Sequence, residues 1–199
     1  TSANVYLPNG KPPAPGSLLG NAQLATTWQR IIAEAKAASS DRAEQIEAAR
    51  RAWAEGFVAE AVENFCRNNA VMDVSGERHY GVLTGDDMAK WRATYEAPLS
   101  YDYGDFTVMK TGPWGQGPAM LQQLALLQGY DISAMDPTGP DFVHLVVEAV
   151  KLAYADREAF YGDPNFVDVP METLLSKEYN DERRKLIDME SASLGFHPG

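Results

Sequence analysis

The loop Gly112–Pro118 is the segment whose residue types and spacing suggest a binding site. It reads Gly-Pro-Trp-Gly-Gln-Gly-Pro and connects a predicted strand to a predicted helix. The backbone amides of such a loop, with the N-terminus of the following helix, can hold an anion such as a substrate carboxylate. Trp114 and Gln116 would shape that site and are the candidate substrate-binding residues. Glycine-rich turns between a strand and a helix are also common as plain connectors, so the sequence leaves both interpretations open.

A histidine and a glutamate form a second candidate group. His144 and Glu148 stand four residues apart, so they share one face of a predicted helix, as a pair of metal ligands would. The sequence offers no evident third ligand near them, and His79 and His197 have no ligand spacing. We therefore expect His144 to be a salt-bridged or capping residue, and we expect neither a metal nor an organic cofactor.

Charged residues near the end of the same helix form a third group. Asp156, Arg157 and Asp163 lie beside its apolar face and could act in catalysis or autoprocessing. We expect instead a structural ion pair that fixes the helix end and the turn after it, because a charge beside a core needs a partner. We assign no catalytic residue within the chain.

The elements that must position these side chains include one long helix between Gly139 and Tyr161. Gly162-Asp163-Pro164 ends it, because proline cannot continue a helix and glycine readily takes left-handed angles. Residues that recur at helical spacing predict its buried stripe, which includes one charged member: Phe142, Val143, Val146, Val150, Ala153, Tyr154, Arg157 and Tyr161.

Shorter elements are predicted on the N-terminal side of the long helix. Residues 1–19 read as an irregular surface segment with a turn at Asn9-Gly10, and Gly56 separates two helices. Thr84 and Asp87 have the spacing of a capping box. The remaining assignments are helices near 24–35, 46–57, 57–68, 120–127, 171–175 and 178–189, a loop with a short strand at 71–82, and one strand at 100–110.

Composition limits the classes of partner. The net charge is −11 and the pI is about 4.7, so we expect no binding to nucleic acid or to anionic membranes, since phosphate contacts need a cationic face. The single cysteine, Cys66, excludes an internal disulfide and is expected to be a buried, inert thiol. The sequence contains no run of 18 apolar residues, so we expect no transmembrane helix. Localisation stays open between the cytoplasm and the periplasm.

The order of several motifs resembles the γ-glutamyltranspeptidase family of N-terminal-nucleophile hydrolases. The resemblance runs with gaps from about residue 5 to residue 198. The matching motifs are Tyr6–Pro13, Glu55–Ala61, Leu83–Met88, Pro98–Tyr103, Glu148-Ala149-x-Lys151, Ala155-Asp156-Arg157, Gly162-Asp163-Pro164, Phe166–Pro170, Leu174–Tyr179 and Arg184–Ile187. The family usually has prolines, serines and glycines before the helix near Leu121, whereas Gly112–Pro118 has no serine.

This resemblance implies an α+β fold, the mainly helical portion of an αββα sandwich whose sheets are completed by sequence outside this chain. It implies one partial domain over residues 1–199, in the C-terminal part of the family's large subunit. The family's precursor cuts itself, and the new N-terminal threonine of the small subunit attacks the amide. Thr1 is followed by Ser-Ala-Asn and does not match that nucleophile, so we expect it to be inert.

The expected activity of the whole precursor is therefore transfer or hydrolysis of γ-glutamyl amides such as glutathione, with the chain alone inactive. Its expected partners are the small subunit of the same precursor, in a heterodimer or a dimer of heterodimers, and a small-molecule amide. The atypical loop keeps a second possibility open, a related amidohydrolase or acylase acting on oxamate-like amides or β-lactam side chains. A third is a non-catalytic helical binding module.

Overall fold

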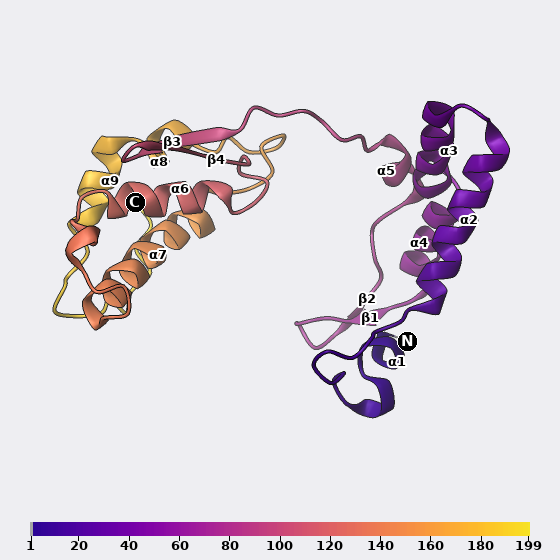
Figure 1. Cartoon of the computed structure of the whole chain (residues 1–199), viewed down its shortest axis with the longest axis horizontal. Coiled ribbons are helices and arrows are strands. Elements are labelled where there is room, and N and C mark those ends of the chain that lie inside the picture. Colours follow the sequence, from indigo (N-terminus) through magenta and orange to yellow (C-terminus); the bar gives the residue numbers. More distant parts are fainter. Residues whose placement is uncertain (1) are drawn as a thin grey trace. The chain divides into compact units, whose positions relative to one another are not determined.

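The chain forms two compact units, residues 1–93 and 94–199, and each is described separately. A computed structural model describes residues 2–199 (Figure 1). Helices dominate both units, and the only strands among the described residues form two small antiparallel hairpins. The expectation of a mainly helical chain with few strands is confirmed. The single partial domain over residues 1–199 and the completed αββα sandwich stay predictions.

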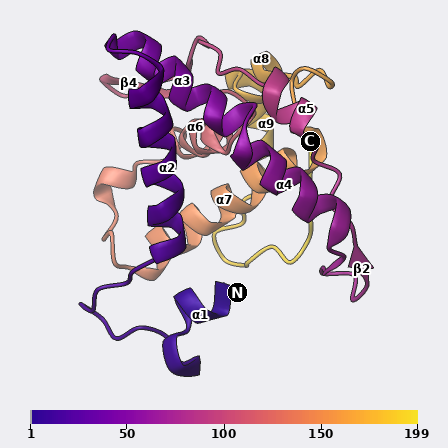
Figure 2. The same ribbon diagram turned by 90° about the vertical axis from the view of Figure 1, so that its right-hand side faces the viewer.

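Unit 1 is built on three successive helices, α2 (Ala22–Ala38), α3 (Arg42–Ala54) and α4 (Phe57–Asn68), shown in Figure 2. Asp41 caps α3 by accepting hydrogen bonds from the amides of Ala43 and Glu44. The helices α3 and α4 are separate, as the glycine at position 56 predicts. A Cβ atom there would lie 3.0 Å from the Ala52 carbonyl oxygen, so the chain turns where only glycine fits without a shift.

The rest of unit 1 consists of short elements. The first residues are more ordered than predicted, with α1 (Ser2–Tyr6) and a 3-10 turn η1 (Pro8–Gly10). Asn9 and Gly10 have positive φ angles, which confirms the turn. The strands β1 (Val71–Met72) and β2 (Arg78–His79) pair as a hairpin, and α5 (Gly85–Lys90) begins with the predicted capping box. In this capping box, the Asp87 carboxylate accepts a hydrogen bond from the Thr84 amide. The Thr84 hydroxyl oxygen accepts one from the Asp87 amide.

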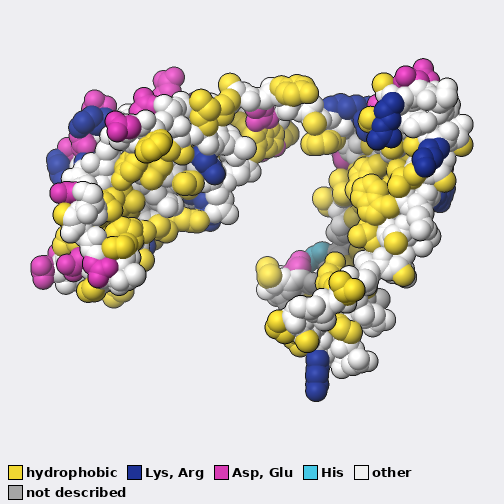
Figure 3. All heavy atoms as spheres, viewed as in Figure 1, with side chains coloured by type: hydrophobic (Ala, Val, Ile, Leu, Met, Phe, Trp, Pro, Cys, Tyr) yellow, Lys and Arg dark blue, Asp and Glu magenta, His cyan; other side chains and the backbone are white. Residues whose placement is uncertain are grey.

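The core of unit 1 is made of small side chains. Ile31 is its one large buried aliphatic residue, and the other buried apolar residues are alanines: Ala35, Ala52, Ala54 and Ala59. Trp28 and Trp53 stack with their ring centroids 5.6 Å apart, yet both stay nearly half exposed. This unit therefore buries little apolar area within itself, and hydrophobic side chains appear on its surface in Figure 3.

Unit 2 contains the elements around the candidate loop. The predicted strand at 100–110 is wrong in one respect, because it is a hairpin of β3 (Leu99–Tyr103) and β4 (Phe106–Lys110). Gly104 turns the chain with φ of 58°, an angle that side chains disfavour. The helices are α6 (Gly117–Leu127), α7 (Pro140–Phe160), α8 (Met171–Leu174) and α9 (Lys177–Arg184), with a 3-10 turn η2 (Ile132–Ala134). The last helix ends earlier than predicted.

The buried face of α7 is not the predicted stripe. The core of unit 2 joins α6 to α7, and its central cluster is Leu126, Ala149, Leu152 and Ala153. Leu145 is also fully buried, while Val143 is half exposed. Only Ala153 of the predicted stripe is buried. The apolar periodicity of α7 fits two adjacent faces, and β-branched residues occupy the outer one, so periodicity alone does not identify the inner face.

The corrected face of α7 predicts a difference between two substitutions. Leu145→Ala leaves a cavity where a side chain is fully buried, so the free energy of unfolding of unit 2 should fall by about 2–5 kcal/mol. Val143→Ala, on the half-exposed face, should change it by less than about 0.5 kcal/mol. Urea unfolding of the two variants measures both values, and equal losses would contradict the assignment.

The capping box of α5 predicts a loss confined to unit 1. Thr84→Ala removes the oxygen that accepts the Asp87 amide, and should cost about 1 kcal/mol of unfolding free energy. Thr27→Ala is the matched control, because Thr27 lies inside α2 and its hydroxyl bonds the Gln23 carbonyl, where alanine has the better helix propensity. A control variant less stable than Thr84→Ala would refute the role of the cap.

Candidate functional site

The candidate loop follows β4 and leads directly into α6. Gly117 begins this helix, and a Cβ atom there would lie 2.6 Å from the Thr111 carbonyl oxygen, so the loop closes tightly on itself. Trp114 projects from it and is half exposed. Gln116 precedes the helix and accepts a hydrogen bond from the Tyr154 hydroxyl at 2.9 Å, which ties the loop to α7.

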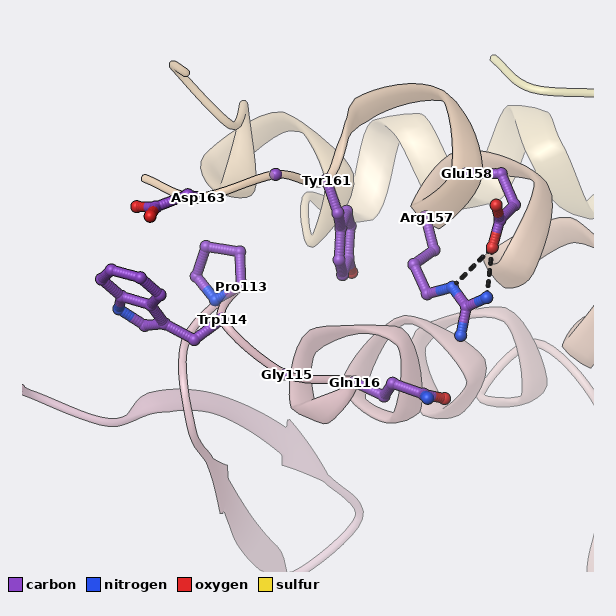
Figure 4. A pocket seen from close by; sticks show the side chains of 9 residues that line it. Pro113, Trp114, Gly115, Gln116, Arg157, Glu158, Tyr161 and Asp163 are labelled. Atoms are coloured by element: carbon purple, nitrogen blue, oxygen red, sulfur yellow. Dashed lines mark hydrogen bonds and ion pairs between the residues drawn. The ribbon is translucent and has the colours of Figure 1, made fainter. Parts of the chain in front are cut away.

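The loop and the end of α7 line a cavity of about 510 Å³ that is widely open to solvent. Nine residues line it: Pro113, Trp114, Gly115, Gln116, Arg157, Glu158, Tyr161, Gly162 and Asp163 (Figure 4). The structure therefore brings both predicted binding residues together with Arg157 and Asp163, which the sequence placed in a separate group. In Figure 4, Pro113 and Trp114 face Asp163 and Tyr161 across the cavity.

Arg157 is the one cation among these lining residues. Its guanidinium pairs with Glu158, the next residue, through Nε at 3.0 Å and through Nη2. It also lies over the Tyr154 ring, 4.4 Å from the centroid. The Arg157 side chain is about a quarter exposed and that of Glu158 more than half exposed. An ion pair this exposed contributes little stability, so a ligand carboxylate could replace Glu158 at small cost.

Tyr161 was not predicted as a site residue, yet it supplies a free polar group. Its hydroxyl is buried and has no hydrogen-bond partner among the described residues. Burial, reinforced by the nearby negative charge of Asp156, raises the Tyr161 pKa well above its usual value, against a smaller opposing effect of Arg157. The phenol thus stays protonated and can donate a hydrogen bond. Only its position just before Gly162-Asp163-Pro164 hinted at this role in the sequence.

The N-terminus of α6 offers fewer donors than the loop suggested. Pro118 occupies its second position and has no N–H, and the neighbouring residues Gly117 and Ala119 are buried. The polar groups that can reach a ligand here are therefore side chains, mainly those of Arg157, Glu158 and Asp163.

The charged group at 156–163 is arranged differently from the prediction, since Asp156 does not pair with Arg157. Asp156 is completely buried and binds Arg183 at 3.1 Å and Gln122 at 2.5 Å. Asp163 instead accepts the Asn165 amide at 2.9 Å, which fixes the turn after α7. The helix does end at this turn, as predicted. Sequence spacing missed Arg183 and Gln122 because both lie on other helices.

His144 and Glu148 do not act as one pair. The His144 Nε2 atom lies 2.8 Å from the Asp188 carbonyl oxygen, and Glu148 binds Lys151 at 2.6 Å. Within residues 2–199, no three His, Cys, Asp or Glu side chains cluster as a metal site would require. Likewise, no helix of that region is long and apolar enough to cross a membrane.

The remaining candidates are a threonine and a thiol. Thr1 lies outside the described residues. Cys66 is a free thiol that is partly rather than fully buried, so the expectation of a buried cysteine is wrong. Its sulfur packs at the place where a Cβ atom of Gly81 would be, 2.7 Å away, so glycine at position 81 makes room for it.

The family model described as gamma-glutamyltranspeptidase matches residues 1–196. This chain belongs to the γ-glutamyltranspeptidase family. It is 32% identical to the Acylase ACY 1 proenzyme of Pseudomonas sp. (strain SE83) over 96% of its length and 30% of the relative's. It is 29% identical to the glutathione hydrolase proenzyme of Bacillus subtilis (strain 168), over 96% of the chain and 28% of the relative.

Two solved structures are similar to this chain in fold. The structure of LmbA2991T421A is 54% identical, with a TM-score of 0.83 over all of this chain and 33% of that one. The Helicobacter pylori γ-glutamyltranspeptidase is 23% identical and superposes with a TM-score of 0.72 over all of this chain and 51% of that one, which supports the fold alone. The chain thus spans about 30% of the curated relatives' length, in the large-subunit region.

The isolated hydroxyl of Tyr161 predicts a specific pH dependence. Because its folded pKa is raised, the folded state keeps a proton that the unfolded chain loses above about pH 10, so its contribution to stability is present below that pH and declines above it. Tyr161→Phe removes the titrating group and so the loss of stability above about pH 10, and the hydroxyl it deletes has no partner within the described chain. The variant should equal or exceed the wild type in unfolding free energy at about pH 8, and should lose less between about pH 8 and about pH 11.

Urea unfolding at the two pH values gives both numbers. Tyr80→Phe is the control, since that residue is well exposed, and it should follow the wild type at both pH values. A loss above pH 10 that is the same for Tyr161→Phe and the wild type would contradict the prediction.

Proposed function

We propose that this chain forms the C-terminal part of the large subunit of a self-processing γ-glutamyltranspeptidase-like enzyme. A small subunit cut from the same precursor would supply the nucleophilic threonine. Two observations carry the proposal. The family model matches residues 1–196, and the chain spans about 30% of the length of relatives that are named proenzymes. In this assembly the chain contributes scaffold and one wall of the substrate site, and the partners form a heterodimer.

The cavity beside Trp114 supports a binding role rather than a catalytic one. None of its nine described lining residues is a serine, threonine or cysteine, the residues whose hydroxyl or thiol groups commonly attack amides. Its volume falls within the range of small-molecule sites, and polar or charged side chains line it beside the two aromatic residues Trp114 and Tyr161. The attacking group would therefore come from the other subunit.

Charge favours a γ-glutamyl substrate for this cavity. A γ-glutamyl group carries a carboxylate and an ammonium on one carbon. Arg157 can bind the carboxylate, while Glu158 and Asp163 can bind the ammonium. Hydrolysis of the amide, or its transfer to an acceptor amine, would then proceed through an acyl-enzyme on the threonine.

A related acylase is the second candidate. The 32% identity to an acylase proenzyme favours it, and the wall formed by Pro113, Trp114 and Tyr161 could accommodate an apolar acyl chain or an amide of the oxamate type. This reading leaves Glu158 and Asp163 without a substrate ammonium. The third candidate, a helical binding module without activity, has no support from the family relationship.

Purified whole precursor tests these alternatives. Intact mass and N-terminal sequencing should show two chains, the smaller beginning with threonine. A γ-glutamyl anilide should then be hydrolysed faster than the matched glutaryl anilide, which lacks only the ammonium group. A reversed preference would support the acylase, and an uncleaved, inactive precursor would refute the enzyme proposal.

Trp114 should affect binding without affecting stability. Trp114→Ala removes a half-exposed aromatic wall of the cavity, so KM of the processed enzyme should rise about 10-fold, the effect of about 1.4 kcal/mol, with the melting temperature unchanged. Phe106→Ala is the control, because Phe106 is an exposed aromatic residue of the same unit outside the cavity lining. An unchanged KM in Trp114→Ala would remove the loop from the substrate site.

A further inference from the structure

Residues 188–199 form a segment without helix or strand, which we call the C-terminal strap. It follows α9 and is the yellow thread in Figure 1. Four polar side chains of α7 bind the backbone of the strap: those of His144, Glu148, Lys151 and Asp156. The contacts occur in the same order along α7 and along the strap, so the two run in the same direction.

The first contacts hold the strap near the N-terminal half of α7. The His144 Nε2 atom is 2.8 Å from the Asp188 carbonyl oxygen. Glu148, which is almost fully buried, accepts the Ser193 amide at 3.3 Å. Lys151 donates to the Ser193 carbonyl at 2.8 Å and to Glu148 at 2.6 Å. Both backbone groups of Ser193 are therefore bound by one ion pair.

The last contacts hold the end of the strap in the core of unit 2. The Asp156 carboxylate accepts the Gly199 amide at 2.9 Å. Arg183 bridges the two segments, since its Nη2 donates both to Asp156 and to the His197 carbonyl. Asp156 is completely buried and Arg183 nearly so. Burying an ion pair has a large desolvation penalty, and this ion pair also binds backbone groups of the strap, a segment that could remain in solvent.

We propose that His144, Glu148, Lys151, Asp156 and Arg183 are positioning residues for self-cleavage of the precursor, because they fix the path of the strap. This inference rests on the proposed function. Self-cleavage breaks one peptide bond and consumes one water, which gives a carboxylate on one side and the free amine of the threonine on the other. None of the five residues touches the reacting atoms in this scheme.

The argument is one of effective concentration. A free chain of about 12 residues has an end-to-end spread of about 20 Å, whereas attack on a peptide bond needs the reacting atoms within about 3–3.5 Å. The strap is anchored at Ser193 and again at Gly199, so only the residues after the last anchor contribute to the end-to-end spread. If the threonine of the proposed precursor lies downstream of Gly199, the residues between them enter the cleavage site from a fixed point and direction.

Three variants of the whole precursor test the proposal. In Gly199→Ala, a Cβ atom would lie 2.3 Å from the Tyr179 hydroxyl and 2.8 Å from Arg183 Cδ, so the strap end or these two side chains must shift although every charged group remains. Glu148→Leu removes the acceptor for Ser193, and Glu148→Gln keeps an acceptor oxygen. Leu194→Ala is the control, because that strap side chain is fully exposed.

We expect Gly199→Ala and Glu148→Leu to slow self-cleavage by about 10- to 100-fold, Glu148→Gln to restore most of the rate, and Leu194→Ala to match the wild type. Hydrogen exchange at Ser193 and Gly199 should accelerate in the slow variants. In Gly199→Ala, which keeps every ion pair, the melting temperature of unit 2 should stay within about 2 °C of the wild type, the scale of a change of some tenths of a kcal/mol.

Two results would overturn the inference alone. One is wild-type cleavage in variants whose strap exchanges freely. The other is a loss of rate that simply follows a fall in melting temperature, which would mean a structural role only. A wild-type precursor that does not cleave itself would instead refute the proposed function, and this inference with it.

Discussion

The negative charge of Asp156 is the constraint on which unit 2 depends. A carboxylate that is completely buried must be compensated, and here three separate segments do so: Gln122 from α6, Arg183 from α9 and the amide of Gly199. These contacts join elements that are distant in the sequence. Asp156 also affects the cavity wall. Tyr161 lies about one turn further along the chain, and the charge of Asp156 helps to keep its phenol protonated.

The sequence predicted local features well because their causes are local. The capping box at Thr84, the break at Gly56 and the end of α7 each depend on residues within four positions of one another. It predicted the inner face of α7 poorly, because Val143, Val146 and Val150 are apolar at helical spacing but lie outside the core. Packing against α6 decides which of the two apolar faces of α7 is buried. The sequence of α7 alone does not determine that packing.

The site was predicted in the same uneven way. The loop around Trp114 and Gln116 was identified from glycine and proline content, and it does line a cavity. Arg157 was identified with the wrong partner, and the free hydroxyl of Tyr161 was not foreseen, because partners across helices α6, α7 and α9 are set by tertiary structure. The family resemblance, in contrast, came from motif order along the chain and did not need any tertiary contact.

Arg184 closes the C-terminal end of α6. Its Nε and Nη2 atoms donate to the carbonyls of Leu126 and Ala125, each at 2.8 Å, while Nη1 binds Asp181 at 2.7 Å. A Cβ atom on Gly129 would lie 2.3 Å from Nε. Positions 129 and 184 are therefore not free to evolve separately. Lineages that keep the arginine should keep the glycine, whereas loss of the arginine would leave room for a side chain at position 129.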